Sequence, residues 1–306
     1  MVALLLCCAA AAALMAVSSH AQQQHGISIS QLVYNHGGPN ATNRSLTEVL
    51  RERVSVRDFG ALGTCGSPDA QPADLTDQNC PDDTAAFLAA FKWAGEPYNK
   101  ITVHVPPGSY RIDGTVTIGS CELILEAGAV LRRVNLTAAA GPIVRLGYHG
   151  RLSGAGSLTS MNPSPRGIVN IGPANLTIYE NVEYAQVRGV SIQGPGTSWS
   201  IMKPDLPVNK RIEGSKGLCF DSSEGYARTH MCKFVPEKPD CVNHTIGGGA
   251  CYQNSARDVT VSDVDVGVYM GPEVNGNQVS NVMMIGMGQA SYFIDGPNSE
   301  NTIRYV

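Results

Sequence analysis

The chain has 306 residues, of which 43% are hydrophobic and 16% are charged, and its formal net charge at pH 7 is −4. The hydrophobic content excludes a disordered chain. The mild acidity argues against a nucleic-acid-binding protein, which normally carries a basic face. Gly is frequent, at 33 residues, whereas aromatic residues make up 6%. This composition is typical of a turn-rich β protein rather than a helical one.

The N-terminus has the pattern of a secretory signal peptide. Residues 1–17 are apolar or small, and Ser19 and Ala21 frame a cleavage site after Ala21. The apolar run is short for a membrane span of about 20 residues, and no second run follows. We therefore expect residues 1–21 to be removed and residues 22–44 to form a flexible segment. The mature protein is expected to be secreted, extracellular and without a membrane span.

Glycosylation sequons agree with secretion, although short triplets of this kind also arise by chance. The five Asn-x-Ser/Thr sequons lie at Asn40, Asn43, Asn135, Asn175 and Asn243.

Cysteine residues are expected to pair in an oxidising compartment. Cys65 and Cys80 bracket a loop rich in Pro and Asp, and we expect them to form a local disulfide. Cys121 is left over in an apolar stretch, which favours a buried thiol. Four further cysteines are close enough in sequence for two more bridges, with three possible pairings. They are Cys219, Cys232, Cys241 and Cys251.

Short β-strands are indicated from residue 101 onward. Ile101, Val103 and Val105 occupy alternate positions, and Gly, Asn or Pro interrupt the strands at regular intervals. This spacing predicts an all-β fold, but it does not separate a sandwich from a solenoid.

One α-helix is expected, over Asp83–Trp93. Its residues are rich in Ala and Phe, and Gly95 follows them. Either Asp82 or Asp83 can cap the free N–H groups of the first turn.

Imperfect repeats favour the solenoid. The segment from Gly271 to Val279 is echoed by the segment from Gly296 to Ile303, and Tyr269 and Tyr292 recur at a similar spacing. A period in the twenties with three short strands per turn is typical of a parallel β-helix. Because no coil can bury its apolar face alone, such a solenoid needs an end cap. The predicted helix is well placed to be that cap.

Three sequence blocks follow one another in a distinctive order: Val54–Ala61, Asp82–Phe87 and Val103–Ile112. They resemble the opening of the pectate-lyase-like domain that rhamnogalacturonase/epimerase-type enzymes and phage tailspike depolymerases share. The resemblance implies an all-β, right-handed parallel β-helix solenoid with an N-terminal capping α-helix, acting on polysaccharide. We expect a single domain over residues 45–306, with a Cys-rich loop excursion at about 195–251.

The resemblance names a fold and not a reaction. The polygalacturonase group of this superfamily carries an Asn-Thr-Asp, an Asp-Asp, a Gly-His-Gly and an Arg-Ile-Lys on consecutive coils. This chain has no Asn-Thr-Asp, its Asp82-Asp83 belongs to the predicted helix, and Tyr148-His149-Gly150 matches only in part. These departures argue against standard polygalacturonase chemistry. His149 and Arg151 are instead expected to be ordinary surface residues.

A carboxylate pair is the first candidate catalytic site. Glycan hydrolysis needs two carboxyl groups, whereas elimination from uronates needs a base and usually a cation. Outward residues of adjacent coils can supply them, because neighbouring rungs lie about 4.8 Å apart. Asp263 lies at a corner, and Asp265 lies between Val264 and Val266 and is expected to face solvent. The alternative is a solvated face that keeps the sheet soluble.

The excursion at about 195–251 is the second candidate, because loops that leave a solenoid often build the binding face. Aromatic rings there can stack on sugars, and a His or Asp can act as a base or an acid. A disulfide-tied loop without a functional role is the alternative. The predicted substrate-binding residues are Trp199, Tyr226, Arg228 and Lys233, and the predicted catalytic residues are Asp221 and His230 together with Asp263 and Asp265.

Two classes of function therefore remain. One is a secreted carbohydrate-active enzyme, a polysaccharide lyase or glycoside hydrolase that acts on an acidic, uronate-containing polysaccharide. The other is a non-catalytic glycan-binding or cell-wall and adhesion β-helix. The expected partner is a polysaccharide and not a nucleic acid. The sequence predicts no metal ligands and no oligomeric state, and Ca²⁺ is expected only if the protein is a lyase.

Overall fold

The computed structural model describes the chain in separate ranges, and the chain divides into two compact units, Met1–Glu52 and Arg53–Val306. In the first unit, β1 (Val33–Tyr34) and β2 (Arg44–Ser45) pair in antiparallel fashion. The predicted signal peptide lies outside the described residues. The described residues are 32–35, 43–46, 49, 53–65, 80–95, 101–134, 141–161, 164, 166–172, 182–195, 215–221, 251–271, 274–294 and 300–304.

The second unit is built from three parallel sheets. The large sheet has 12 strands, in the order β3 (Val54–Ser55), β4 (Thr102–Val105), β7 (Glu122–Leu125), β10 (Arg151–Gly154), β14 (Gln186–Arg188), β18 (Ser255–Ser262), β15 (Ser191–Gln193), β11 (Ser157–Ser160), β8 (Ala129–Arg133) and β5 (Gly108–Arg111), with β21 (Gln278–Ile285) and β23 (Thr302–Arg304) beyond β18. The second sheet has 6 strands, β22 (Ala290–Ile294), β19 (Val266–Met270), β16 (Lys216–Phe220), β12 (Val169–Ile171), β9 (Val144–Leu146) and β6 (Val116–Ile118). The third has 3 strands, β13 (Val182–Glu183), β17 (Cys251–Tyr252) and β20 (Val274–Asn275).

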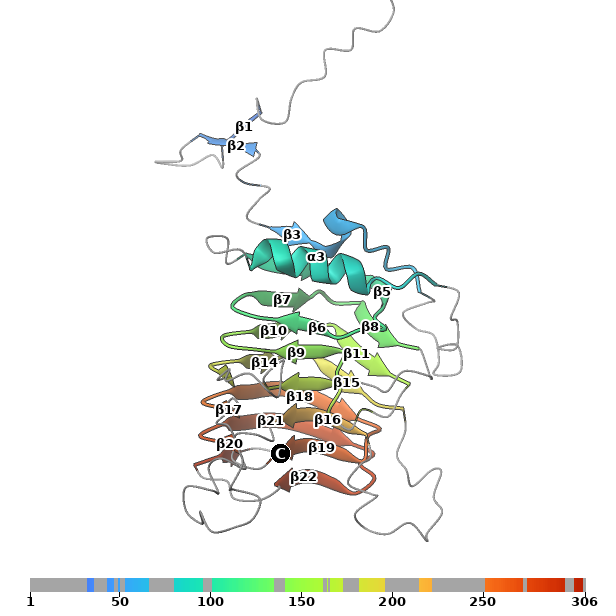
Figure 1. The fold of residues 1–306 in the computed structure, drawn as a ribbon, viewed down its shortest axis with the longest axis vertical. Coiled ribbons are helices and arrows are strands. Elements are labelled where there is room, and N and C mark those ends of the chain that lie inside the picture. Colours follow the sequence, from blue (N-terminus) through green and yellow to red (C-terminus); the bar gives the residue numbers. More distant parts are fainter. Residues whose placement is uncertain are drawn as a thin grey trace, which may run out of the picture. The chain divides into compact units, whose positions relative to one another are not determined.

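The chain passes through these sheets in turn. After β10 and β11 in the large sheet it enters β12 and then β13, and it returns to the large sheet as β14, beside β10. Each strand therefore pairs in parallel with its counterpart one coil later, as Leu152 does with Val187 and Leu158 with Ile192. Figure 1 shows these strands stacked in layers. The predicted β architecture with stacked parallel strands is confirmed.

Similar apolar residues stack inside the coils. Val116, Val144 and Val169 are aligned on neighbouring strands of the second sheet, and all three are fully buried. β-Branched residues suit such a column, because they fit the pleated surface and pack against the same residue one rung away. This column forms part of one continuous core.

The predicted alignment of Tyr269 with Tyr292 is wrong by one residue. Tyr269 pairs with Phe293, and Tyr292 pairs with Val268. A shift of one position moves a side chain to the other face of a sheet. Accordingly, Tyr269 stacks on Phe293 with ring centroids 5.9 Å apart, whereas Tyr292 packs against the core and its burial raises the pKa of its phenol to about 12.

Helix α3 (Thr84–Ala94) lies across the N-terminal end of the stack (Figure 1). The predicted helix is thus present, with Gly95 as its C-cap. Its Phe87 is fully buried and contacts Tyr110 of the first coil, with ring centroids 5.6 Å apart. The helix covers apolar side chains that the end coil would otherwise expose.

Asp82, and not Asp83, caps the first turn of this helix. Asp82 Oδ1 accepts a hydrogen bond from the backbone N–H of Thr84 at 3.0 Å. The carboxylate of Asp83 instead accepts the N–H groups of Leu62 and Gly63, at 2.8 and 3.3 Å. Asp83 is 4% exposed, and this desolvation raises the pKa of its carboxyl. Both residues therefore have structural roles.

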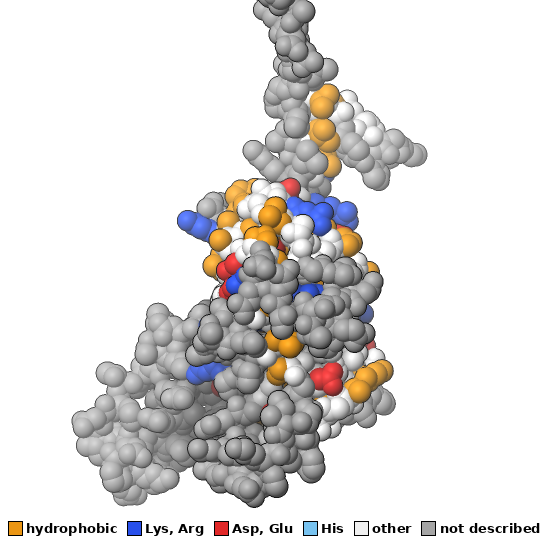
Figure 2. All heavy atoms as spheres, turned by 90° about the vertical axis from the view of Figure 1, so that its right-hand side faces the viewer, with side chains coloured by type: hydrophobic (Ala, Val, Ile, Leu, Met, Phe, Trp, Pro, Cys, Tyr) orange, Lys and Arg blue, Asp and Glu red, His pale blue; other side chains and the backbone are white. Residues whose placement is uncertain are grey.

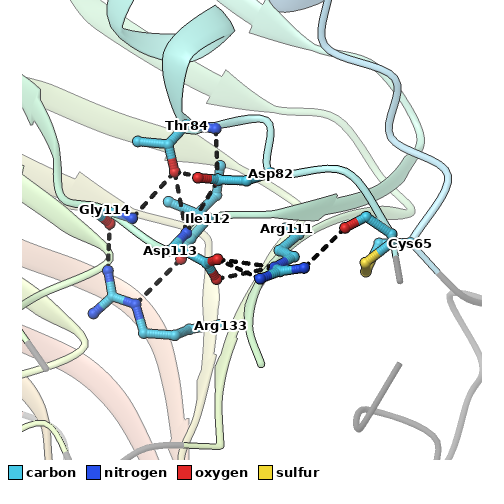
Figure 3. A network of polar contacts seen from close by, with 9 residues as sticks. Cys65, Asp82, Thr84, Arg111, Ile112, Asp113, Gly114 and Arg133 are labelled. Atoms are coloured by element: carbon cyan, nitrogen blue, oxygen red, sulfur yellow. Dashed lines mark hydrogen bonds and ion pairs between the residues drawn. A yellow bond between two sulfur atoms is a disulfide. The ribbon is translucent and has the colours of Figure 1, made fainter. Parts of the chain in front are cut away.

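A polar network ties this end of the stack together (Figure 3). The Thr84 hydroxyl accepts the backbone N–H groups of Asp113 and Gly114, each at 3.1 Å. Arg111 forms an ion pair with Asp113 and donates to the carbonyl of Cys80 at 2.9 Å. The network joins the start of the helix to the first coil and to the disulfide loop.

Two local predictions near this end have different outcomes. Cys65 and Cys80 form the expected disulfide, with Cα atoms 5.0 Å apart. The alternation of Val54 and Val56 in the sequence predicts a strand here as well, but β3 extends only over Val54–Ser55, because Val56–Phe59 form a 3-10 helix with a capping box.

The predicted continuous excursion at about 195–251 is wrong in its extent. Lys216–Phe220 form β16, which pairs with β12 on one side and β19 on the other. Leu218 and Phe220 are fully buried, so this short strand completes a rung of the core. The flanking residues 196–214 and 222–250 lie outside the described residues.

Within the described ranges, no helix has both the length and the apolar character that a membrane crossing requires.

Candidate functional site

Asp265 does not face solvent, contrary to the sequence prediction. It is 4% exposed, and its Oδ2 accepts the backbone N–H of Ser215 at 3.1 Å. The reason is that Asp263–Asp265 form the corner between β18 and β19, where Asp263 has a φ of 56°. The alternation of inward and outward side chains holds only within a strand, so it does not apply there.

The predicted pair of catalytic carboxylates is therefore not assembled. Asp263 is half-buried and accepts a hydrogen bond from Gln193 Nε2 at 3.4 Å. Asp265 is occupied with a backbone group and does not share a solvent-facing surface with Asp263. Asp221 follows β16 and is half-buried. It lies near Cys219 and Cys251. The pKa of both thiols is raised by their burial and, to a smaller extent, by the negative charge of Asp221.

The disulfides predicted for Cys219 and Cys251 are not formed; both residues are buried free thiols. Cys219 packs with Val266 and Tyr269 in a small separate cluster, whereas Cys251 belongs to the main core. The two thiols therefore belong to different apolar clusters. Cys121 is a buried thiol, as predicted, and its burial raises its pKa to about 11.

Most other predicted site residues lie outside the described residues. Asn43 is exposed, and its side-chain oxygen accepts a hydrogen bond from Asn35 at 2.7 Å. Its glycosylation stays a prediction. The predicted residues outside the described ranges are Trp199, Tyr226, Arg228, His230, Lys233, Cys232, Cys241, Asn40, Asn135, Asn175 and Asn243.

Three aromatic side chains gather at one exposed corner of the stack. Tyr148, His149 and Tyr184, which we call the aromatic ledge, lie just before β10 and β14. The ring centroids of Tyr148 and His149 are 4.2 Å apart, and those of His149 and Tyr184 are 5.1 Å apart. Tyr148 is 43% exposed and Tyr184 is 44% exposed. The ledge thus presents a cluster of rings to solvent.

The ledge arises from the register of two coils. Arg151 pairs with Gln186, so His149 and Tyr184, each two residues earlier, occupy equivalent positions. Both are in the left-handed region, with φ values of 56° and 57°. That conformation is uncommon for a bulky side chain, yet the equivalent residues of the later coils, Gln253, Gly276 and Glu300, adopt it too. Among these five coils, the left-handed residue carries an aromatic ring in the two early ones.

The base of the ledge is held by hydrogen bonds. The backbone N–H of His149 donates to the carbonyl of Glu183 at 2.9 Å. The carboxylate of Glu183 in turn accepts a hydrogen bond from the hydroxyl of Tyr252. Since these groups belong to three successive coils, the ring cluster is fixed relative to the sheets.

Polar and cationic side chains continue from the ledge over the outer face of the large sheet. Arg151 and Gln186 are exposed at the starts of β10 and β14. Arg188 at the end of β14 is aligned with Arg257 of β18, and both are exposed. Aromatic rings can stack on the apolar faces of sugars, and guanidinium groups bind carboxylates through paired hydrogen bonds.

One other face of the molecule is less distinctive in its described part. Figure 2 shows the side on which β5, β8 and β11 lie in Figure 1, and hydrophobic, basic and acidic side chains are mixed over its described part. Among the described residues, no three His, Cys, Asp or Glu side chains come together as ligands for a metal ion.

Sequence reasoning missed Tyr148 and Tyr184. In the sequence, Tyr148 stands only beside an incomplete Gly-His-Gly motif, and His149 and Arg151 are expected to be ordinary surface residues. The available signal was an aromatic residue at a corner where Gly or Asn is usual. Using that signal requires the register between coils, which only the structure supplies.

No protein-family model and no curated protein matches this sequence. Solved structures similar to it include PfbA, a surface adhesin of Streptococcus pneumoniae, with a TM-score of 0.41, 10% identity, and coverage of 79% of this chain and 61% of that chain. Another is the tailspike protein of E. coli bacteriophage HK620 in complex with a pentasaccharide, with a TM-score of 0.34, 12% identity, and coverage of 90% of this chain and 54% of that chain. The chain thus spans less than two thirds of the length of either protein.

Proposed function

We propose that this protein is a secreted, extracellular carbohydrate-binding protein with a right-handed parallel β-helix fold of the pectate-lyase-like type. A polysaccharide chain binds at the aromatic ledge of Tyr148, His149 and Tyr184. The observation that carries the proposal is the exposure of these clustered rings at a left-handed corner. These rings are exposed to solvent, and they lie at a corner where the left-handed backbone conformation is unfavourable for bulky residues. Exposed rings of this kind are suited to contact a ligand.

The polymer that fits this surface best is acidic. The protein has few charges and a net charge of −4, yet Arg151, Arg188 and Arg257 are exposed on the face that continues from the ledge. Guanidinium groups favour carboxylate partners. A uronate-containing polysaccharide offers both features, because each sugar has an apolar ring face and a carboxylate.

A lyase or glycoside hydrolase is the second candidate function. The observation that favours it is the hydrogen-bonded pair of Glu183 and Tyr252, which adjoins Tyr184. A carboxylate next to a bound sugar is a candidate general acid or base. The burial of Asp265 removes the carboxylate pair that the sequence suggested, so binding without cleavage is the primary proposal.

The test compares wild type with the double variant Tyr148→Ala/Tyr184→Ala. Binding to polygalacturonate, alginate and rhamnogalacturonan is measured by titration calorimetry. Loss of two stacking rings, at about 0.5–1.5 kcal/mol each, predicts roughly tenfold weaker binding. Gln253→Ala is the matched control, because Gln253 is exposed at the same corner one coil later, with a φ of 57°.

A folded double variant that binds as tightly as wild type would show that the ledge is not the binding site. Cleavage is followed in the same samples. Products that absorb in the ultraviolet indicate elimination, and new reducing ends without that absorbance indicate hydrolysis. Either result makes the protein an enzyme and moves the second candidate to first place.

A further inference from the structure

Two arginine side chains lie directly beside each other on neighbouring strands. Arg188 of β14 pairs in register with Arg257 of β18. Both side chains are well exposed, at 63% and 54%. Like charges directly opposite one another on adjacent strands destabilise a sheet. Exposed ion pairs contribute little to stability. A gain in stability therefore does not explain why these two arginines lie side by side.

Asp258 holds the two guanidinium groups together. The Nε atoms of Arg188 and Arg257 both lie 3.4 Å from its Oδ2. Its other oxygen accepts a hydrogen bond from Asn281 Nδ2 at 2.7 Å. Asp258 has a φ of 58°, at the bend where β18 turns from one part of the large sheet to the other. The carboxylate is thus positioned by the fold and in turn positions both cations.

The carboxylate of Asp258 stays ionised in mildly acidic solution. The hydrogen bond from Asn281, together with the charges of Arg257 and Arg188, lowers the pKa of this carboxyl below its ordinary value. Two cations and one anion leave a net positive charge at the bend. Each guanidinium group contacts Asp258 through its Nε atom.

We infer that Arg188 and Arg257, positioned by Asp258, form an anion-binding fork that binds a carboxylate or sulfate group of the polysaccharide held at the aromatic ledge. The inference rests on the proposed function and adds the chemistry that distinguishes an acidic from a neutral sugar. Two guanidinium groups on adjacent strands, with Cα atoms about 4.8 Å apart, can share one planar anion or bind two successive ones.

The distance between fork and ledge suits a single polymer. Tyr184, at the corner, and Arg188 are four positions apart in the sequence, so their Cα atoms lie at most about 14 Å apart. Gln186 lies between them in the sequence, and its exposed side chain is on the same face of β14 as that of Arg188. A sugar chain that stacks on the ledge can therefore follow β14 and reach the fork with an acidic group.

The test uses the full chain and three probes: polygalacturonate, its fully methyl-esterified form, and dextran sulfate, with neutral dextran as a baseline. Binding is measured for wild type, for Arg188→Gln/Arg257→Gln and for Asp258→Asn. Arg304→Gln is the matched control, since Arg304 is an exposed arginine of β23 on the same face of the large sheet as Arg257. Thermal denaturation confirms that each variant is folded.

Wild type should bind polygalacturonate at least about tenfold more tightly than the methyl ester, because hydrogen bonds to charged partners contribute about 1.5–3 kcal/mol. The double variant should lose that preference while its affinity for the methyl ester is unchanged. Asp258→Asn should weaken the preference less, and Arg304→Gln should leave it intact. Dextran sulfate binding that depends on the same two arginines identifies sulfate as an equivalent ligand group, and its absence restricts the fork to carboxylates.

Equal wild-type affinity for the acid and the methyl ester overturns the fork and leaves the ledge proposal standing. So does an acid preference that survives in the double variant. Failure of wild type to bind either form overturns the proposed function itself.

Discussion

One corner of the stack is used in two different ways. In the early coils, the left-handed position carries the rings of His149 and Tyr184. In the later coils, the residue after the equivalent position is an asparagine, which is buried at Asn254 and Asn277 and half-buried at Asn301. The left-handed backbone conformation is common to all these coils. The side chain of the left-handed residue is exposed and can contact a ligand, whereas the side chain of the asparagine after it is held by hydrogen bonds.

The asparagines form a ladder along the stack. Asn277 Oδ1 accepts the backbone N–H of Asn254 at 3.0 Å, and Asn301 Oδ1 accepts that of Asn277 at 2.9 Å. The side-chain amide of Asn277 also donates to the carbonyls of Cys251 and Asn275, at 3.3 and 3.0 Å. Each side chain therefore satisfies buried backbone groups of the preceding coil.

The ladder cannot extend to the first coil of the ledge, because that coil has Gly150 at the equivalent place. A Cβ atom there would lie 2.5 Å from the carbonyl oxygen of Ile118 and 3.1 Å from that of Gly119. Backbone atoms cannot move aside as a flexible side chain can. The early corner is thus stabilised by close backbone packing, and the later corner by side-chain amides.

The largest expected effect is that of Asn277→Ala. It leaves the buried N–H of Asn254 without an acceptor and removes two further donors, so we expect a loss of about 3 kcal/mol in the free energy of unfolding. Denaturant unfolding measures it, with Gln278→Ala, an exposed neighbour, as the control. Glycan affinity of the folded protein should be unchanged. A loss below about 1 kcal/mol would mean that water replaces the side chain.

Gly150→Ala tests the early corner, with an expected loss of about 2 kcal/mol from the contact with the Ile118 carbonyl. Gly276→Ala is the comparison, because a Cβ there meets nothing closer than 3.8 Å and only its φ of 66° opposes the change. A smaller loss at Gly150 than at Gly276 would contradict the packing explanation.

Tyr184→Gly should separate stability from binding. Glycine adopts the left-handed conformation without penalty, so we expect the free energy of unfolding to rise by up to about 1 kcal/mol. Glycan affinity should fall severalfold because one ring is lost. Thermal unfolding and titration calorimetry on the same preparation measure the two effects. Destabilisation by this change would indicate that the ring of Tyr184 serves packing instead.

The smallest expected effect is on the chemical labelling of Cys251, whose carbonyl accepts a hydrogen bond from Asn277 of the ladder. Burial raises the pKa of this thiol, so the reactive thiolate is scarce at pH 8. Iodoacetamide should leave Cys251, Cys219 and Cys121 unmodified in the native protein and modify them after unfolding. Asn277→Ala should increase labelling at Cys251 alone. Peptide mapping without reduction checks this, and a peptide that joins Cys219 or Cys251 to another cysteine would contradict the free-thiol assignment.

Local patterns in the sequence determined a substantial part of this structure. The stacked parallel strands, the helix near Asp83–Trp93, the Cys65–Cys80 disulfide and the buried thiol of Cys121 follow from periodicity, capping residues and short-range spacing. These features depend on residues close together in the chain, where side-chain chemistry acts directly on the backbone. The later coils were also regular enough, at 23 and 24 residues between successive asparagines, to indicate a solenoid.

Only the tertiary structure decided which side chains meet and which face water. Asp265 is buried because the chain turns a corner there. Lys216–Phe220 form a strand because they pair with β12 and β19 and bury apolar side chains between them. The ledge and the arginine fork join residues on coils of unequal length; Ala185 and Asn254, one coil apart in space, are 69 residues apart in sequence. Register between such coils is determined by the packing of the whole stack, and a pattern within one segment does not contain it.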